Sequence, residues 1–311
     1  MRIRLSLLAV LASLLLLSGC ELDGFLDSDR FREDFQYTYD LKPGGRLTLE
    51  NFNGSVEILG WEKASVQIAG TKHAGTESDL KELKIETTAQ EGSVRIRTVR
   101  PSGRYRNMGA RYFIRVPRQV ELERIATSNG SIRVEDIEGN ARLETSNGAV
   151  RIRKLAGRLD VRTSNGSIEG DEVASDAVLR TSNGPIRLTQ ASGSMDAATS
   201  NSSINARFAK LSPQKPLRFG SSNGSIDVAF EALAGNELRA STSNSSITVR
   251  LPASVNAQLR ADTSHGSITS DFNVTVRSGT MGKDHLEGQI GEGGPLVQLS
   301  TSNGAIRVLR L

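Results

Sequence analysis

The residues best suited to binding chemistry form one basic window in the first third of the chain. Between Glu91 and Glu121 there is no acidic residue, but there are eight arginines and three aromatic residues. Guanidinium groups make paired hydrogen bonds to carboxylates and phosphates. We therefore take six of these arginines as candidate anion-binding residues, namely Arg95, Arg97, Arg104, Arg106, Arg111 and Arg115.

Two segments of this window, Ser93 to Thr98 and Arg111 to Val116, alternate arginine with aliphatic or aromatic residues. Alternation with a period of two is typical of a half-buried strand, so the arginines of both segments should share an exposed face. We expect a long hairpin, or two strands joined by an exposed loop. An anionic glycan or a lipid headgroup would suit such a face. The alternative is a solvated strand that protects a sheet edge from aggregation.

The sequence gives less support to catalysis. The densest acidic group is Glu169, Asp171, Glu172 and Asp176. Glycoside cleavage needs two carboxylates set across a cleft, whereas these acids lie near a predicted turn among basic residues, which favours ion pairs. The three histidines are far apart in the sequence and the only cysteine is near the N-terminus, so we predict no metal, no cofactor and no catalytic residue. A polysaccharide-acting enzyme stays the alternative function.

A six-residue phrase, Thr163 to Ile168, recurs along most of the chain and must position these side chains. The spacing between copies is 18 residues at first and 21 or 22 later, and a fixed period of about 20 residues predicts a solenoid. Asn and Gly suit tight corners, and stacked Asn side chains can hydrogen-bond to one another. We therefore interpret the repeated asparagines as a structural turn ladder, made of Asn129, Asn147, Asn165, Asn183, Asn201, Asn223, Asn244 and Asn303.

Two apolar columns flank each of these asparagines. Three residues after Asn165 comes Ile168 and four residues before it comes Val161, and the other copies carry apolar residues at the same places. Each rung should therefore hold two strands of period two. We predict an all-β fold, a single-stranded right-handed parallel β-helix (β-solenoid) with rungs of about 18–22 residues. The alternative is an antiparallel meander of Asn-Gly hairpins. It is disfavoured because each 18-residue period contains two corners of different composition and returns each column to the same place, whereas a meander would put successive Asn-Gly turns on opposite edges.

Other segments depart from the repeat. We expect Leu47 to Ile58 to form the first rung, Ala64 to Ala69 to add a strand, and Thr76 to Leu83 to contain one short helix. The segment Asp271 to Pro295 breaks the rhythm with several glycines. There we expect a loose loop that contains one degenerate rung.

The N-terminus has the pattern of an export signal. Arg2 and Arg4 precede an apolar run from Leu5 to Leu17, which is too short for a membrane span with its own flanks. The run ends in Leu17-Ser18-Gly19-Cys20, which resembles the lipobox of bacterial lipoproteins and implies that Cys20 is lipidated. We expect residues 1–19 to be a lipoprotein signal peptide, residues 20–40 a lipidated tether and N-terminal cap, and residues 41–311 an adhesin-like β-solenoid domain.

The expected location is a membrane surface. Two or three acyl chains anchor a protein firmly, so the protein should be exported and held on the membrane through Cys20. By resemblance to the lipoprotein sorting rule, Glu21 after the cysteine favours the outer membrane. An exported lipoprotein is not expected to bind nucleic acid. Without Arg2 and Arg4 the chain is almost neutral, which by itself predicts no partner.

A resemblance to a known family rests on specific phrases. Asn51 to Ile58, followed by Gly60-Trp61 and Val66 to Ile68, precedes the reiterated rungs, and Gly288 to Gly291 and Thr301 to Val308 close the chain. This pattern resembles the bacterial putative-adhesin family of unknown function, the β-strand-repeat envelope proteins. The resemblance implies a β-helix in the cell envelope. We expect a non-catalytic adhesive or scaffolding surface, and an envelope regulatory component that binds a protein partner is a further alternative.

Overall fold

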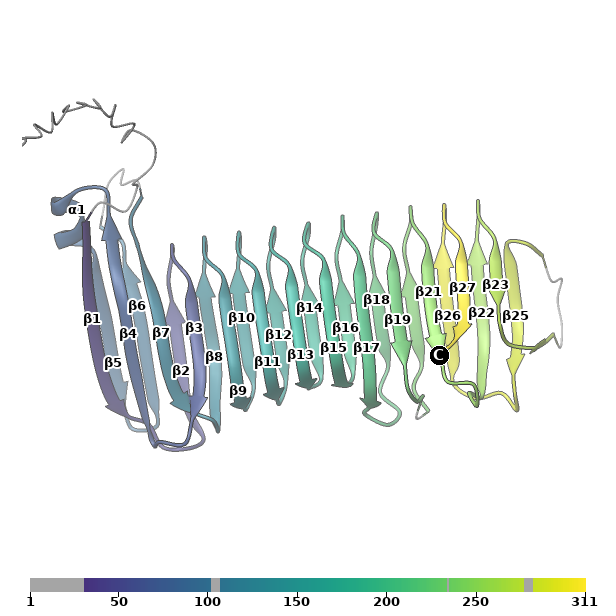
Figure 1. The fold of residues 1–311 in the computed structure, drawn as a ribbon, viewed down its shortest axis with the longest axis horizontal. Coiled ribbons are helices and arrows are strands. Elements are labelled where there is room, and N and C mark those ends of the chain that lie inside the picture. The colour runs from purple at the N-terminus through teal and green to yellow at the C-terminus, as the bar shows by residue number, and fades with distance from the viewer. Residues whose placement is uncertain (1–30, 102–106, 234, 277–281) are drawn as a thin grey trace, which may run out of the picture.

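The computed structural model describes residues 31–101, 107–233, 235–276 and 282–311. Within these residues the chain forms two long β-sheets, of 13 and 14 strands, and one short helix. Figure 1 shows an elongated stack in which the strands run across the long axis. The all-β solenoid that the repeat predicts is confirmed.

The spatial order of the strands in each sheet is not always their order in the sequence. Along the stack, the 13-stranded sheet consists of β1 (Phe31–Asp40), β4 (Ser65–Ala74), β7 (Gly109–Pro117), β3 (Val56–Trp61), β9 (Ile132–Glu138), β11 (Val150–Ala156), β13 (Ile168–Ala174), β15 (Ile186–Gly193), β17 (Ile204–Leu211), β19 (Ile226–Phe230), β21 (Ile247–Leu251), β27 (Ile306–Arg310) and β23 (Ile268–Ser270). The 14-stranded sheet consists of β24 (Val274–Thr275), β25 (His285–Ile290), β22 (Ala257–Thr263), β26 (Leu296–Thr301), β20 (Leu238–Ser241), β18 (Leu217–Gly220), β16 (Met195–Ala198), β14 (Ala177–Arg180), β12 (Leu159–Arg162), β10 (Ala141–Thr145), β8 (Val120–Thr127), β2 (Gly45–Glu50), β6 (Ser93–Val99) and β5 (Lys84–Gln90).

Each turn of the coil gives one strand to each sheet. In the regular region the pairing is parallel, and Ile168 lies beside Val150 on one side and Ile186 on the other. These residues are one period apart in the sequence, so the repeat returns each column to the same place. An antiparallel meander would instead pair neighbouring strands in opposite directions, and it is therefore excluded. The right-handed winding stays a prediction.

The asparagines of the repeat form a continuous hydrogen-bonded ladder along one corner. The side-chain Nδ2 of Asn165 donates to Oδ1 of Asn147 at 2.7 Å, and Asn183 donates to Asn165 in the same way. Seven such bonds of 2.7–2.8 Å join all eight predicted asparagines. An amide carries both a donor and an acceptor, so each side chain satisfies the next.

The threonine that begins each phrase is buried behind this ladder. The hydroxyl of Thr163 donates to the carbonyl oxygen of Gly148 in the preceding rung at 3.1 Å and accepts from the Gly166 amide at 3.2 Å. Thr181 repeats both contacts one rung later. The hydroxyl therefore satisfies polar backbone groups that the corner would otherwise leave buried without partners.

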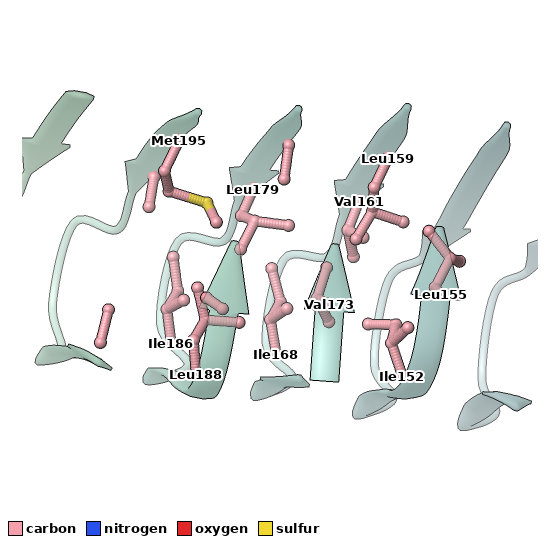
Figure 2. Close-up of a cluster of buried hydrophobic side chains, with 14 of the residues drawn as sticks. Ile152, Leu155, Leu159, Val161, Ile168, Val173, Leu179, Ile186, Leu188 and Met195 are labelled. Atoms are coloured by element: carbon pink, nitrogen blue, oxygen red, sulfur yellow. The ribbon is translucent and has the colours of Figure 1, made fainter. Parts of the chain in front are cut away.

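The core lies between the two sheets. Figure 2 shows side chains of both sheets pointing toward one another, among them Ile168 and Ile186 from one sheet and Val161 and Leu179 from the other. All four are fully buried. Both predicted apolar columns therefore point inward, because side chains alternate between the two faces of each strand.

The corner opposite the asparagine ladder, which we call the far corner, contains a regular bulge. Glu172 has a φ of 52° and Lys154 has the same value one rung earlier, and each left-handed residue precedes an inward apolar residue, Val173 or Leu155. Strict alternation would place that apolar residue on the outer face, so the left-handed residue restores its inward direction. Acidic or basic side chains at the bulge stay in solvent.

Stacking order and sequence order differ at both ends of the coil. The first rung, β2 and β3, lies between the rung of β6 and β7 and the rung of β8 and β9. At the other end β26 and β27, coloured yellow in Figure 1, lie between β20 and β21 on one side and β22 and β23 on the other. The expected degenerate rung within Asp271 to Pro295 is wrong, because the described residues there pair as β24 and β25 in one sheet only.

The N-terminal end also contains antiparallel strands and the helix. β4, which includes the strand expected at Ala64 to Ala69, pairs antiparallel with both β1 and β7. The helix α1 (Glu77–Glu82) forms where it was expected, and the Thr76 hydroxyl caps it by accepting from the Asp79 amide. In the part of the chain that the structure describes, no helix is long and apolar enough to span a bilayer.

Replacing Thr163 with valine tests the corner. Thr163→Val keeps the shape of the side chain but leaves the Gly148 carbonyl and the Gly166 amide without their hydroxyl partner, so we expect a loss of about 1–3 kcal/mol in the free energy of unfolding. Urea unfolding followed by circular dichroism measures it. Thr269→Val, on the exposed side of β23, is the control and should be nearly neutral. Equal stability of both variants would contradict the role of the buried hydroxyl.

Candidate functional site

The six candidate arginines do not share a face. Arg95 and Arg97 lie on β6 in the 14-stranded sheet, whereas Arg111 and Arg115 lie on β7 in the 13-stranded sheet. Arg104 and Arg106 lie outside the described residues. The predicted hairpin is therefore wrong, because β6 pairs with β2 and β5 while β7 pairs with β3 and β4. Each half of the basic window has its own surroundings.

The half on the 14-stranded sheet is neutralised by neighbouring acids. One carboxylate, Glu50, lies 3.1 Å from Arg95, 3.8 Å from Arg97 and 3.4 Å from Arg124. Arg124 continues the network to Glu144 at 2.9 Å. These guanidinium groups already have carboxylate partners, so this face is a poor site for an external anion.

A shallow groove of about 440 Å³ lies above this network and contains two carboxylates, Glu50 and Glu144. Burial raises the pKa of the Glu144 carboxyl, but hydrogen bonds from Arg142 and Arg124 outweigh it and hold that pKa below its ordinary value. A general acid in glycoside cleavage needs a raised pKa. Glu144 is therefore poorly suited to act as that acid.

The half on the 13-stranded sheet adjoins aromatic side chains. The Arg115 guanidinium carbon lies 5.2 Å from the ring centroid of Phe113 and 6.0 Å from that of Trp61. The Lys63 ammonium lies 5.1 Å from the same Trp61 centroid. We call Trp61, Lys63, Phe113 and Arg115 the Trp61 platform. Cations over aromatic faces are attracted by the ring quadrupole, which holds this group together.

Strand pairing brings the platform together from three segments. Arg115 of β7 lies opposite Leu59 of β3, which leads to Trp61, and opposite Gln67 of β4. The Gln67 side chain accepts a hydrogen bond from Arg115 at 3.4 Å. The Trp61 indole N–H donates to the Ser65 carbonyl at 2.8 Å, which fixes the ring. The platform is thus ordered by contacts within the sheet.

Sequence reasoning identified Arg115 but missed its aromatic partners as a site. The window also contains Tyr112, which the alternation of β7 turns inward, where its hydroxyl lies 2.5 Å from that of Thr98. Trp61 is the only tryptophan of the chain and lies more than fifty positions before Arg115. A single tryptophan in the sequence marks a candidate binding residue, but only the pairing of β3 with β7 shows that Trp61 lies beside Arg115.

The acidic group of the sequence is divided among ion pairs and hydrogen bonds. Glu169 pairs with Arg151 at 3.0 Å, Asp171 accepts from Thr189 at 2.5 Å, and Asp176 pairs with a lysine near the far corner. Glu169 and Asp171 lie in a groove of about 450 Å³ with four arginines, Arg133, Arg151, Arg153 and Arg187. Other charged side chains also pair between neighbouring rungs, as Arg153 does with Glu135.

The histidines lie at separate places. His285 Nδ1 lies 2.5 Å from Asp262 on the 14-stranded sheet, and His265 is at the asparagine-ladder corner. Among the described residues there is no group of three or more His, Cys, Asp or Glu side chains that could hold a metal ion.

Comparison with known proteins adds the family. No curated protein matches this sequence. It is similar to the solved structure of a putative adhesin from Bacteroides fragilis NCTC 9343, with 13% identity, 89% of this chain and 97% of that chain covered, and a TM-score of 0.40. A putative adhesin from Parabacteroides merdae ATCC 43184 has 8% identity, with 91% of this chain and 98% of that chain covered and a TM-score of 0.48. A putative lipid binding protein from Parabacteroides distasonis ATCC 8503 has 12% identity, with 89% of this chain and 96% of that chain covered and a TM-score of 0.39. The family model Toastrack DUF4097 matches residues 44–309. The resemblance to the putative-adhesin family is thereby confirmed, and the chain belongs to the Toastrack family DUF4097.

Proposed function

We propose that this protein is a non-catalytic lipoprotein of the bacterial envelope whose Trp61 platform binds an anionic glycan. The observation that carries the proposal is the arrangement of Arg115 and Lys63 around the Trp61 ring, with Phe113 beside them. The C–H faces of a sugar ring pack on aromatic rings, and the two cations bind a carboxylate or phosphate of the same ligand.

The charges around Arg115 support binding of an external anion. Its hydrogen-bond partner is the neutral Gln67, and no carboxylate pairs with it in the part of the chain that the structure describes. By contrast, Arg95 and Arg97 share Glu50. A guanidinium that lies on aromatic rings keeps its outward N–H groups for a ligand.

A lipid surface fits this face less well than a glycan. Insertion into a bilayer needs a cluster of exposed apolar side chains, and among the described residues Leu311 is the only large hydrophobic residue that is exposed. Close to the platform, Glu57 and Arg133 carry opposite charges on the same sheet. Tryptophan and arginine, which the platform combines, are common anchors of binding sites.

The non-catalytic role rests on the state of the carboxylates. In the groove beside Glu50, the pKa of Glu144 is held low by arginines, and Glu169 is paired in the groove on the opposite sheet. Glu144 and Glu169 are therefore poorly suited to serve as the acid and base of glycoside cleavage.

The anchor stays a prediction from the sequence, because Cys20 lies outside the described residues. If it is lipidated, the protein is held at the membrane by the end of the coil that carries β1 and the Trp61 platform, since β1 is the described strand nearest to Cys20 in the sequence and forms the edge of its sheet at that end (Figure 1). The rest of the coil would then extend away from that end, as a scaffold or adhesive surface.

Substitution at the platform tests glycan binding. Trp61→Ala and Arg115→Gln should each weaken binding of an acidic polysaccharide to the chain beginning at Glu21 by about tenfold or more, as for a central aromatic or arginine contact. Titration calorimetry against hyaluronate or alginate measures the affinity. Arg218→Gln, an exposed arginine on β18 of the opposite sheet, is the matched control and should change nothing.

Two outcomes would contradict this proposal. One is the absence of binding to any acidic polysaccharide by the parent protein. The other is binding that Trp61→Ala leaves unchanged while vesicles of anionic phospholipid compete for it, since that result would make the lipid headgroup the ligand.

Removal of the cysteine tests the anchor. Cys20→Ser takes away the only thiol of the chain, so labelling with an alkyne analogue of palmitate should disappear and the protein should leave the membrane fraction. Ser18→Ala, which keeps a small residue before Gly19, should retain the label. Persistent labelling of Cys20→Ser would show that the acyl chain is attached elsewhere.

A further inference from the structure

A second recess lies at the far corner of the coil, away from both the asparagine ladder and the Trp61 platform. It has a volume of about 450 Å³ and crosses the corners of three successive rungs and one loop. The residues that line it include one glycine and five polar or charged residues, namely Gly157, Arg158, Ser175, Asp176, Lys210 and Ser212. The size is that of a site for a small ligand.

The recess exists because one rung is longer than the preceding ones. Asn223 follows Asn201 by 22 residues, whereas Asn201 follows Asn183 by 18. The additional residues form a loop after β17. Fully buried Asn236 holds this loop through two hydrogen bonds, to the carbonyl oxygens of Ser212 at 2.6 Å and Lys215 at 2.8 Å.

The loop also bends back over the earlier corners. Lys215 reaches the Asp176 carboxylate, which belongs to a corner two rungs earlier. Asp176 further accepts from the amide and the hydroxyl of Ser194, at 3.2 Å and 2.8 Å, and from the Ser212 hydroxyl at 3.4 Å. The hydrogen bond from Lys215 lowers the pKa of Asp176. This carboxylate is therefore ionised and already has its partners.

Two cations of the recess have no such partner. Arg158 and Lys210 are at its rim, and neither forms an ion pair with a described residue. The hydrogen bonds of Arg158 are made by its backbone: the amide donates to the Asn140 side chain and the carbonyl oxygen accepts from the Ala141 amide. With Lys215 balanced by Asp176, the recess carries an excess of positive charge, which attracts an anion.

A buried hydroxyl without a partner points to the same conclusion. Ser175 is 4% exposed, lines the recess, and its Oγ makes no hydrogen bond with a described residue. The equivalent position holds Gly157 in the preceding rung and Gly193 in the following one, so the corner itself does not require serine. A buried hydroxyl with no partner lowers stability, and a ligand that accepts its hydrogen bond would supply the missing partner.

We infer that the far-corner recess binds the anionic group of a single acidic sugar unit, a carboxylate or a phosphate. Arg158 and Lys210 pair with the anion, and the Ser175 hydroxyl donates to one of its oxygens. The sugar ring lies on the glycine corners, where Gly157 and Gly193 present no side chain. This site is separate from the Trp61 platform and does not rest on the function proposed for it.

Calorimetry on the purified full-length protein tests the inference with four probes: glucuronate, glucose 6-phosphate, inorganic phosphate and glucose. We expect the two acidic sugars to bind and glucose not to bind. The double variant Arg158→Gln/Lys210→Gln should lose binding, and Arg218→Gln should retain it as the matched control. Trp61→Ala should also retain it, which distinguishes failure at this site from failure of the platform.

Ser175→Ala separates binding from stability. Because no described residue pairs with this hydroxyl, its removal should leave the thermal midpoint unchanged or raise it, while the affinity for glucuronate falls about tenfold, the effect of one lost hydrogen bond to a charged group. Three results would overturn the inference: no binding of either acidic sugar, affinity unchanged in both Ser175→Ala and the double variant, or inorganic phosphate binding as tightly as glucose 6-phosphate.

Discussion

Parallel backbone pairing holds equivalent residues of successive rungs one strand spacing apart, about 4.8 Å. Each position on the coil therefore meets its own copies, and a side chain is tolerated in a column only if it can lie beside the same or a complementary group. Asparagine meets this condition because its amide both donates and accepts, which produces a ladder of seven side-chain hydrogen bonds. Threonine meets it by turning its hydroxyl to the backbone of the preceding rung. Where the sign of the charge changes from one rung to the next, ionised side chains pair across the rungs, as Glu135 does with Arg153.

The same condition explains why most of the charged surface is unsuited to ligand binding. Columns that alternate in sign satisfy their own charges, as Glu50 does with Arg95 and Arg97 and as Glu169 does with Arg151. Candidate sites appear where the regular register is interrupted. The Trp61 platform lies where the antiparallel strand β4 joins parallel β7, and the far-corner recess lies where one rung carries additional residues. An irregular rung is free of the requirement that neighbouring rungs carry matching groups.

The ends of the coil show a second use of irregular pairing. A solenoid must protect its terminal rungs, since an open edge presents unpaired backbone groups. The last rung in sequence, β26 and β27, is placed inside the stack, and the outermost strands are the short β23 and β24. At the N-terminal end, the antiparallel strands β1 and β5 form the two edges. The coil thus ends in antiparallel strands at the N-terminal end and in short strands at the other end.

The sequence alone determined the repeating part of this protein, because a fixed period states directly which residues lie side by side. The inward direction of Ile168, the contacts of Asn165 with Asn147 and Asn183, and the parallel pairing all follow from it. The tertiary structure alone decided everything that lacks a period. Nothing in the spacing of Arg97 and Arg111 shows that they belong to different sheets, that Trp61 meets Arg115, or that Lys215 reaches Asp176. These contacts join segments with no common repeat, so they depend on where the whole chain places its non-repeating strands and loops.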